Sequence, residues 1–291
     1  MKVLSLIPRI MAVEPAVNWS GTEAKNSLFI YPFEDDFETR CLEAAEEYNP
    51  DLILMFAFGE GPYCPNTDKI RLIRDKFNIV YMASDGACRG LWPVLKRFRD
   101  ADCFSAMVNI DGSHHWPEGT IDLVTLSPLD QSRYSNRTPI KDRPYRLGFM
   151  GGEGAIGNPR RDISQILLGK NVLTMGKRDE RWGSNQQYTD FMLNSQAIIN
   201  FPQTGLGNLH IKARALEAGL AGAVLFEQSC SFLKDYVPPE EHYFQWTTTE
   251  DVTTFLETPL DIREKMAENF REKVLPLTDP DKFVEKVMNV L

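Results

Sequence analysis

The sequence contains few cysteines and lacks long runs of apolar residues. Its 291 residues include five cysteines, an odd number without a paired CxxC spacing, which argues against a disulfide framework or a cysteine-based zinc site. No run reaches the roughly 18 apolar residues that a membrane helix needs. The apolar segment at residues 3–7 is interrupted by Pro8 and Arg9, so it predicts a first β-strand rather than a signal peptide. Together these features predict a cytoplasmic protein.

An excess of basic residues is also absent. Asp and Glu number 41 against 32 Lys and Arg, which gives a formal net charge of −9. A broad duplex-DNA surface requires a dense basic face, so nucleic acid is not the expected partner, while a local basic pocket remains compatible with this charge. The composition, 43% hydrophobic and 25% charged, is that of a globular protein and does not indicate a disordered or fibrous chain.

Strand-like and helix-like segments alternate through most of the sequence, which indicates an α/β architecture with mainly parallel strands. Residues 127–145 are rich in Ser, Arg, Asp and Pro and show no periodicity, which is typical of a linker between domains. We therefore expect two domains, at residues 1–140 and 141–291.

Residues 208–227 combine two cations and a carboxylate on a helical segment with a run of small residues and an apolar strand. Lys212, Arg214 and Glu217 fall within about one and a half helical turns. A helix N-terminus attracts phosphate, and the planar guanidinium of an arginine matches phosphate oxygens. A carboxylate one turn further along could accept hydrogen bonds from a ribose. The segment predicts a site for a nucleoside diphosphate.

This stretch resembles the donor-binding signature of GT-B glycosyltransferases, in particular the CgeB-like group of the glycosyltransferase group 1 family. That signature has a basic residue, an Arg, a Glu, a small-residue and Gly turn, and a strand. Residues 188–200, a Tyr-led helix followed by a strand that ends in Asn, match the segment upstream of it. The resemblance covers approximately residues 145–290. One departure is Leu209, which stands where many retaining members carry a Glu.

The resemblance implies two Rossmann-like domains with an interdomain cleft, the first on the acceptor side and the second binding the donor, and a C-terminal helix that can cross back to the first. It implies a hexosyl- or pentosyltransferase that moves a sugar from a nucleotide diphosphate sugar to an acceptor hydroxyl. Neither a metal nor a cofactor besides the donor is expected. The expected donor-binding residues are Gly151, Gly152, Gly154, Arg160, Asn208, Lys212, Arg214 and Glu217.

The glycine-rich loop after the strand at residues 146–150 supports a competing interpretation. Gly152, Gly154 and Gly157 match GxGxxG, so an NAD(P)-dependent oxidoreductase is an alternative. In that fingerprint the helix opens inside the glycine motif, whereas Pro159 predicts a helix that begins beyond it. On the glycosyltransferase hypothesis, the loop approaches the donor pyrophosphate and Arg160 supplies charge.

The acceptor side offers only candidates. Asp85, in a polar turn after a predicted strand, could be the general base, although it could equally cap the following helix or close a turn, and Glu60 is the alternative base. His210, beside the signature, could donate a proton to a phosphate or a sugar hydroxyl. Glu227 could contact the cleft or be an exposed loop acid. The missing Glu at position 209 leaves a third hypothesis open, a protein that binds a nucleotide sugar without catalysing its transfer.

Overall fold

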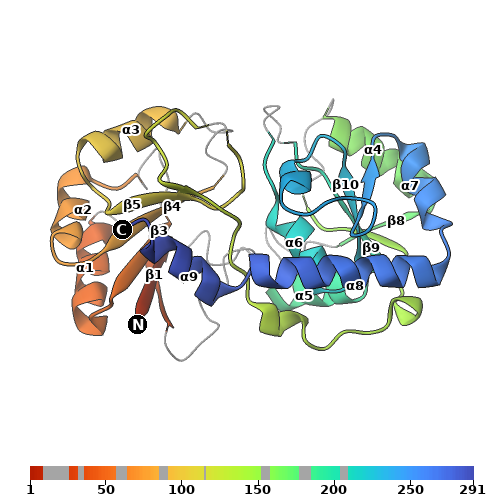
Figure 1. The fold of residues 1–291 in the computed structure, drawn as a ribbon, viewed down its shortest axis with the longest axis horizontal. Helices are drawn as coiled ribbons and strands as arrows, with labels where there is room; N and C mark the ends of the chain where they lie inside the picture. The colour runs from red at the N-terminus through yellow and green to blue at the C-terminus, as the bar shows by residue number, and fades with distance from the viewer. Residues whose placement is uncertain are drawn as a thin grey trace. The chain divides into compact units, whose positions relative to one another are not determined.

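The computed structural model describes residues 1–8, 26–31, 36–56, 64–84, 91–114, 116–151, 158–176, 185–203 and 209–291. These residues form two compact units (Figure 1). Unit 1 comprises Met1–Asp130 and Asp279–Leu291, and unit 2 comprises Gln131–Thr278. Unit 2 thus begins ahead of the domain boundary expected at residue 140, and the last chain segment belongs to unit 1.

Unit 1 is built on a parallel sheet with the described strand order β2-β1-β3-β4-β5-β6. Its strands are β1 (Val3–Pro8), β2 (Asn26–Tyr31), β3 (Leu52–Phe56), β4 (Ile79–Ala83), β5 (Ala106–Asn109) and β6 (Leu123–Val124). Successive side chains of a strand point to opposite faces of a sheet, so a sheet covered on both faces needs continuous apolar strands. The runs LILMF in β3 and IVYMA in β4 meet that need, and all their residues are buried.

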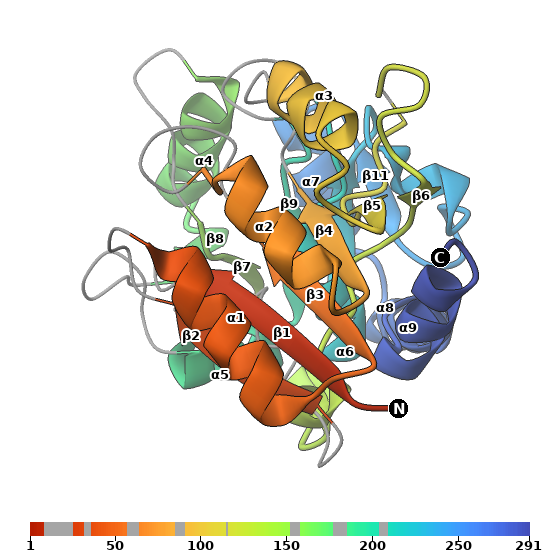
Figure 2. The same ribbon diagram turned by 90° about the vertical axis from the view of Figure 1, so that its left-hand side faces the viewer.

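Helices cover both faces of this sheet (Figure 2). They are α1 (Phe37–Tyr48), α2 (Thr67–Arg74), α3 (Trp92–Asp100) and α9 (Pro280–Met288). Ile53 and Met55 of β3 pack in the cluster that holds the apolar residues of α1, α2 and α3. Leu52 and Leu54 point the other way, into the cluster that contains Phe283 and other apolar residues of α9. Two cores therefore lie on opposite faces of the unit 1 sheet.

Unit 2 is built on a second parallel sheet, with the described order β11-β10-β9-β7-β8. Its strands are β7 (Leu147–Phe149), β8 (Leu173–Met175), β9 (Ala197–Asn200), β10 (Val224–Gln228) and β11 (Phe244–Trp246). Its helices are α4 (Pro159–Gly169), α5 (Asn185–Leu193), α6 (Ala213–Leu220), α7 (Thr249–Leu256) and α8 (Leu260–Leu277). Alternate residues of the central strands, Ile199 and Phe226 among them, form its core with residues of α4, α7 and α8.

The predicted linker at residues 127–145 contains the boundary between the two units, and from Gln131 onward it packs into unit 2. It contains two 3-10 turns, η3 (Gln131–Tyr134) and η4 (Ile140–Asp142), and buries Tyr134 and Ile140. Arg143 is buried as well, and it donates to the carbonyl oxygens of Thr138, Ser195 and Ala221 at 2.8–2.9 Å. Residues 127–145 are polar partly because Arg143 forms hydrogen bonds with distant parts of the chain, and hydrophobic periodicity does not detect such bonds.

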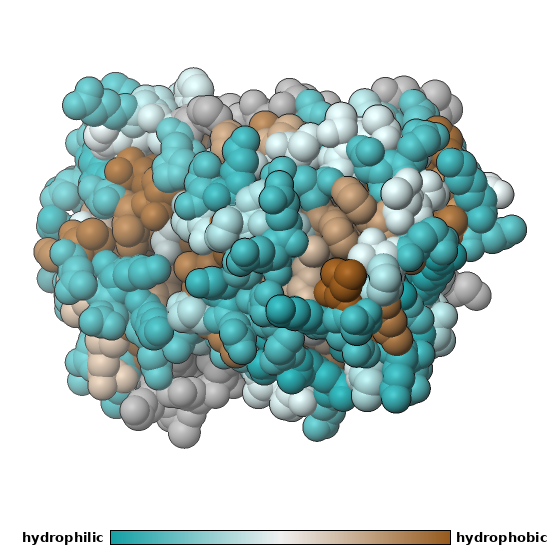
Figure 3. Space-filling model, turned by 45° about the vertical axis from the view of Figure 1, so that its right-hand side comes forward, coloured by the Kyte–Doolittle hydropathy of each residue, from teal (hydrophilic) through white to brown (hydrophobic). Residues whose placement is uncertain are grey.

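The face of the molecule in Figure 3 carries mostly polar side chains. Figure 3 shows one face on which hydrophobic residues form small separate groups among hydrophilic ones. The exposed large hydrophobic residues come from different elements, for example Leu72 from α2, Ile166 from α4 and Ile262 from α8. Among the described residues, no helix is long and apolar enough to span a membrane.

Candidate functional site

The carboxyl ends of the unit 2 strands bring together residues that the sequence carries far apart. β7 ends just before Gly151, β9 ends at Asn200, and Glu227 lies near the end of β10. Because these strands are parallel and adjacent, their carboxyl ends lie at one edge of the sheet, the usual ligand edge of open α/β folds. Helix α6 follows β9 along the chain, with Lys212 as its N-cap residue. We call this edge of unit 2 the carboxyl-edge site.

Arg214, in the first turn of α6, reaches across this edge. Its guanidinium lies over the ring of Phe149, with 4.8 Å between Cζ and the ring centroid, and its Nη1 donates to Oδ1 of Asn200 at 3.3 Å. A Cβ atom on Gly151 would lie 2.6 Å from Nη2 of Arg214, so the absence of a side chain at Gly151 makes room for the guanidinium. The buried Nε of Arg214 has no hydrogen-bond partner among the described residues. The guanidinium of Arg214 is thus held by Asn200 at Nη1, and it keeps N–H groups that can donate to another partner.

Arg160, in the first turn of α4, brings a second guanidinium to this edge. Its Cζ lies 5.7 Å from the centroid of the Phe201 ring, and its Nη2 donates to the carbonyl oxygen of Gln203 at 2.8 Å. Burial lowers the pKa of Arg160, and the positive charge of Arg214 lowers it further. The mutual repulsion of the two arginines favours a bound anion at this edge, because an anion relieves the repulsion.

His210 and Lys212 lie just before α6 and contact each other. The Lys212 ammonium is 2.5 Å from Nε2 of His210. An ammonium can only donate, so this ring nitrogen acts as the acceptor and the other carries the ring proton. His210 is buried, with 4% of its surface exposed. In this arrangement Nδ1 is the ring nitrogen that can donate, and the donor role of His210 stays a prediction.

Glu217 lies one turn into α6 and is enclosed by hydroxyl groups. Its Oε1 accepts from the Tyr134 hydroxyl at 3.1 Å, and its Oε2 accepts from the Tyr188 hydroxyl at 2.7 Å. Burial raises the pKa of Glu217, and the tyrosine bonds and two nearby arginines oppose that rise. The definite partner that a buried carboxylate needs is therefore a pair of tyrosines. A carboxylate can accept about four hydrogen bonds, so Glu217 keeps acceptor capacity beyond its two tyrosine bonds.

Glu227 is fully buried at the end of β10, so it is not an exposed loop acid. Its Oε2 accepts from Nδ2 of Asn200 at 2.8 Å, and its Oε1 has no hydrogen-bond partner among the described residues. Burial raises the pKa of Glu227 to about 7, although the Ser231 hydroxyl, the Asn200 amide, Arg214 and Lys212 all act to lower it. The Ser231 hydroxyl lowers the pKa of Glu227 although it is not placed to form a hydrogen bond with Oε1.

Several predicted site residues lie outside the described residues. These are Glu60, Asp85, Gly152, Gly154 and Asn208, and they stay predictions. The helix after the glycine loop does begin at Pro159, with the side chain of Asn158 accepting from the backbone N–H of Arg160. It therefore opens beyond Gly157, as the sequence predicts, which disfavours a dinucleotide fingerprint. Within the part of the chain that the structure describes, no group of three or more His, Cys, Asp or Glu side chains could hold a metal ion.

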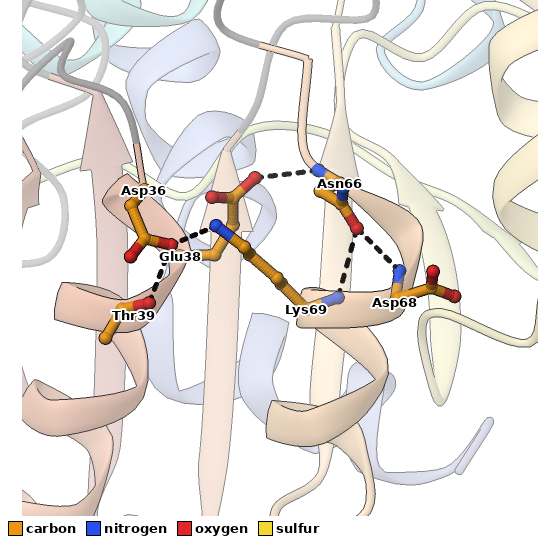
Figure 4. Close-up of polar contacts among 6 residues, drawn as sticks. All are labelled: Asp36, Glu38, Thr39, Asn66, Asp68 and Lys69. Atoms are coloured by element: carbon orange, nitrogen blue, oxygen red, sulfur yellow. Dashed lines mark hydrogen bonds and ion pairs between the residues drawn. The ribbon is translucent and has the colours of Figure 1, made fainter.

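A polar cluster in unit 1 joins the starts of α1 and α2 (Figure 4). Oε1 of the buried Glu38 accepts from the backbone N–H of Asn66 at 2.7 Å, and Oδ1 of Asn66 accepts from the N–H groups of Asp68 and Lys69. The Lys69 ammonium contacts Asp36, the residue before α1. The polar groups of this cluster bind one another, so the cluster fixes the starts of α1 and α2 and has a structural role.

Comparison with known proteins identifies the fold. No protein-family model matches the chain, and no curated protein sequence matches it. Among solved structures, it is similar to HepE from Anabaena in complex with UDP and glucose, with a TM-score of 0.61, 10% identity, and coverage of 99% of this chain and 98% of HepE. Another is an alpha-glucosyltransferase in complex with UDP-glucose and DNA containing an abasic site, with a TM-score of 0.64, 10% identity, and coverage of 100% and 99%.

The same comparison finds an enzyme of another reaction class. A UDP-GlcNAc 2-epimerase from Neisseria meningitidis bound to UDP-GlcNAc aligns with a TM-score of 0.52 and 12% identity, over 99% of each chain. The predicted two-part α/β architecture of GT-B glycosyltransferases is confirmed. One fold can host several reactions, so the reaction has to be argued from the site. Membership of the CgeB-like group stays a prediction.

Proposed function

We propose that this protein is a glycosyltransferase that moves a sugar from a nucleotide diphosphate sugar to an acceptor hydroxyl, and that it acts in the cytoplasm. The observation that carries the proposal is the grouping of Arg160, Lys212 and Arg214 at the carboxyl-edge site, around the start of α6. Three cations and the N–H groups of a helix start form an environment for a diphosphate. Structures of this fold with UDP or UDP-glucose bound support the same choice of ligand.

The chemistry follows from where negative charge develops. When the bond between the sugar and the diphosphate breaks, the departing diphosphate gains charge, and fixed cations stabilise that charge without having to reorganise. In the proposed arrangement Arg214 and Lys212 contact the diphosphate, and Arg160 adds charge from α4. Glu217 accepts the ribose hydroxyls with the acceptor capacity that its two tyrosine bonds leave.

Unit 1 holds the acceptor in this proposal. A general base there removes the proton of the attacking hydroxyl, and Asp85 and Glu60 are the candidates from the sequence. The sugar that the protein transfers decides whether it is a hexosyltransferase or a pentosyltransferase.

The first test is ligand-dependent thermal stability. A panel of UDP, GDP, ADP, TDP, CMP, NAD and NADP, with and without EDTA, is measured on the wild type, on Arg214→Met and on Arg146→Met. A ligand at 100 times its dissociation constant stabilises the folded state by about 2.7 kcal/mol. We expect one nucleoside diphosphate to stabilise the wild type and Arg146→Met, with or without EDTA. Arg146, half-exposed in its ion pair with Glu257, is a matched control in the same unit.

The outcomes separate the alternatives. Loss of the nucleoside diphosphate effect in Arg214→Met supports the carboxyl-edge site, whereas stabilisation by NAD or NADP alone, unchanged in that variant, moves the ligand to the glycine loop. Incubation with the matching nucleotide sugar and a set of hydroxyl acceptors then reports the reaction. A glycosylated acceptor with free nucleoside diphosphate identifies a transferase, an isomerised donor identifies an epimerase, and binding without turnover identifies a non-catalytic protein.

A further inference from the structure

Glu227 belongs to a chain of hydrogen bonds that ends at Arg214. Asn200 sits in the middle, since its Nδ2 donates to Oε2 of Glu227 and its Oδ1 accepts from Nη1 of Arg214. An asparagine amide presents donors at one end and an acceptor at the other. Whichever group fixes the donor end therefore fixes the direction of the acceptor end. In this structure a buried carboxylate fixes the donor end.

The burial of Glu227 needs an explanation beyond folding. An ionised carboxylate without full hydrogen bonding is costly in a protein interior, and Oε1 has no partner among the described residues. Among the described residues, the groups that interact with Glu227 include Asn200 from β9, Lys212 and Arg214 at the start of α6, and three residues of unit 2 near β10 and β11. These three are Cys230, Ser231 and Tyr243. Only Lys212 and Arg214 in this set carry positive charge, and both belong to the carboxyl-edge site.

The position of Glu227 is also unfavourable for an anion that binds at Arg214. A bound diphosphate adds negative charge close to the cations that stabilise ionised Glu227, and like charges disfavour ionisation. Binding of the diphosphate and protonation of Glu227 therefore favour each other, and this coupling is reciprocal. The neutral carboxyl group keeps the bond from Asn200, because its carbonyl oxygen is still an acceptor.

We propose that Glu227 is a positioning residue of the donor site, which holds Arg214 toward the diphosphate through Asn200 and takes up a proton when the diphosphate binds. This inference rests on the proposed function and extends it to a residue that does not touch the ligand. It requires both effects, the fixed orientation of Asn200 and the coupling to a proton.

Two substitutions separate shape from charge. Glu227→Gln keeps an oxygen that accepts from Asn200 and removes the ionisable group. Glu227→Leu has a similar volume and removes the acceptor as well. One hydrogen bond changes an equilibrium by about tenfold, so we expect Glu227→Leu to bind UDP-glucose about tenfold more weakly than the wild type. We expect Glu227→Gln to bind within about threefold of it.

The proton is measured by calorimetry. Titrations with UDP-glucose at pH 7 in two buffers of different ionisation enthalpy give the number of protons taken up on binding. Both phosphates of UDP-glucose are esterified, so it lacks the terminal phosphate ionisation near pH 6 that UDP has. We expect net proton uptake in the wild type and in Glu257→Gln, an exposed carboxylate control, and none in Glu227→Gln. The melting temperature of each ligand-free variant reports any change in folding.

Either of two results overturns the inference: Glu227→Leu that binds within twofold of the wild type, or equal proton uptake in the wild type and Glu227→Gln. Should Glu227→Leu fail to fold, the comparison between the wild type and Glu227→Gln decides alone. A wild type that none of UDP, GDP, ADP and TDP stabilises in the thermal panel refutes the proposed function itself. That failure is distinct, because it is seen before any variant is made.

Discussion

The buried carboxyl group of Glu227 should make the stability of the ligand-free protein depend on pH. The perturbation is Glu227→Gln, which mimics the neutral carboxyl group and does not ionise. Burial raises the pKa of Glu227 in the folded protein from its ordinary value of 4.5 to about 7. At about 1.4 kcal/mol per pKa unit, this difference corresponds to roughly 3 kcal/mol in the free energy of unfolding.

The sign follows from proton binding in the two states. Between pH 4.5 and about 7 the folded protein keeps a proton on Glu227 that the unfolded chain has lost. The free energy of unfolding therefore falls as the pH rises through this window. The contribution of the neutral carboxyl group is fully present below pH 4.5 and is lost above pH 7. The glutamine variant has no such loss, so it should gain on the wild type as the pH rises.

Urea denaturation at pH 5 and pH 8 measures the effect. We expect the two proteins to differ by less than about 1 kcal/mol at pH 5, and the variant to be more stable by up to about 3 kcal/mol at pH 8. Comparing variant with wild type at each pH cancels the other titrating groups. For the exposed ion-pair residue in Glu257→Gln, we expect a difference that changes by no more than about 0.5 kcal/mol. A difference between Glu227→Gln and the wild type that is the same at both pH values would refute the reasoning.

Three further predictions use other sites. Arg143→Met leaves two buried carbonyl oxygens and one half-buried carbonyl oxygen without their donor, so urea denaturation should show a loss of about 3 kcal/mol, and a loss below 1 kcal/mol would count against it. Gly151→Ala places a Cβ 2.6 Å from Nη2 of Arg214, so calorimetry should show an about tenfold loss of affinity for UDP-glucose, which an unchanged affinity would contradict. Asn66→Ala removes the cap of α2 and should cost about 1 kcal/mol in urea denaturation, with Lys96→Ala, from an exposed ion pair, as a control that should stay near wild type.

The regular elements of the fold could be predicted from local patterns. Apolar runs and helical periodicity predict β9 at residues 197–200, where it lies, and α4 starting at Pro159. Two strands were not predicted, β2 and β11. β11 has three residues, too few to show a period, and its pairing with β10 is a contact between distant parts of the chain.

The candidate site could be predicted in part, for a similar reason. The charges and small residues of the signature predict Arg214 and Glu217 as site residues, but not what holds them. The Tyr134 hydroxyl that meets Glu217 comes from 83 residues away, in a segment without any period. Likewise, nothing local shows that Glu227 is buried or that Asn200 links it to Arg214. Local sequence indicates which groups can do chemistry, and the fold decides which partners they meet.

The division of unit 1 between two chain segments has a consequence for folding during synthesis. The ribosome completes all of unit 2 before it makes α9, whose Phe283, Val284 and Val287 cover one face of the unit 1 sheet. Unit 2 can therefore fold while that apolar face is still open. Partly made chains expose a surface that favours aggregation or chaperone binding, and this exposure ends only when α9 emerges.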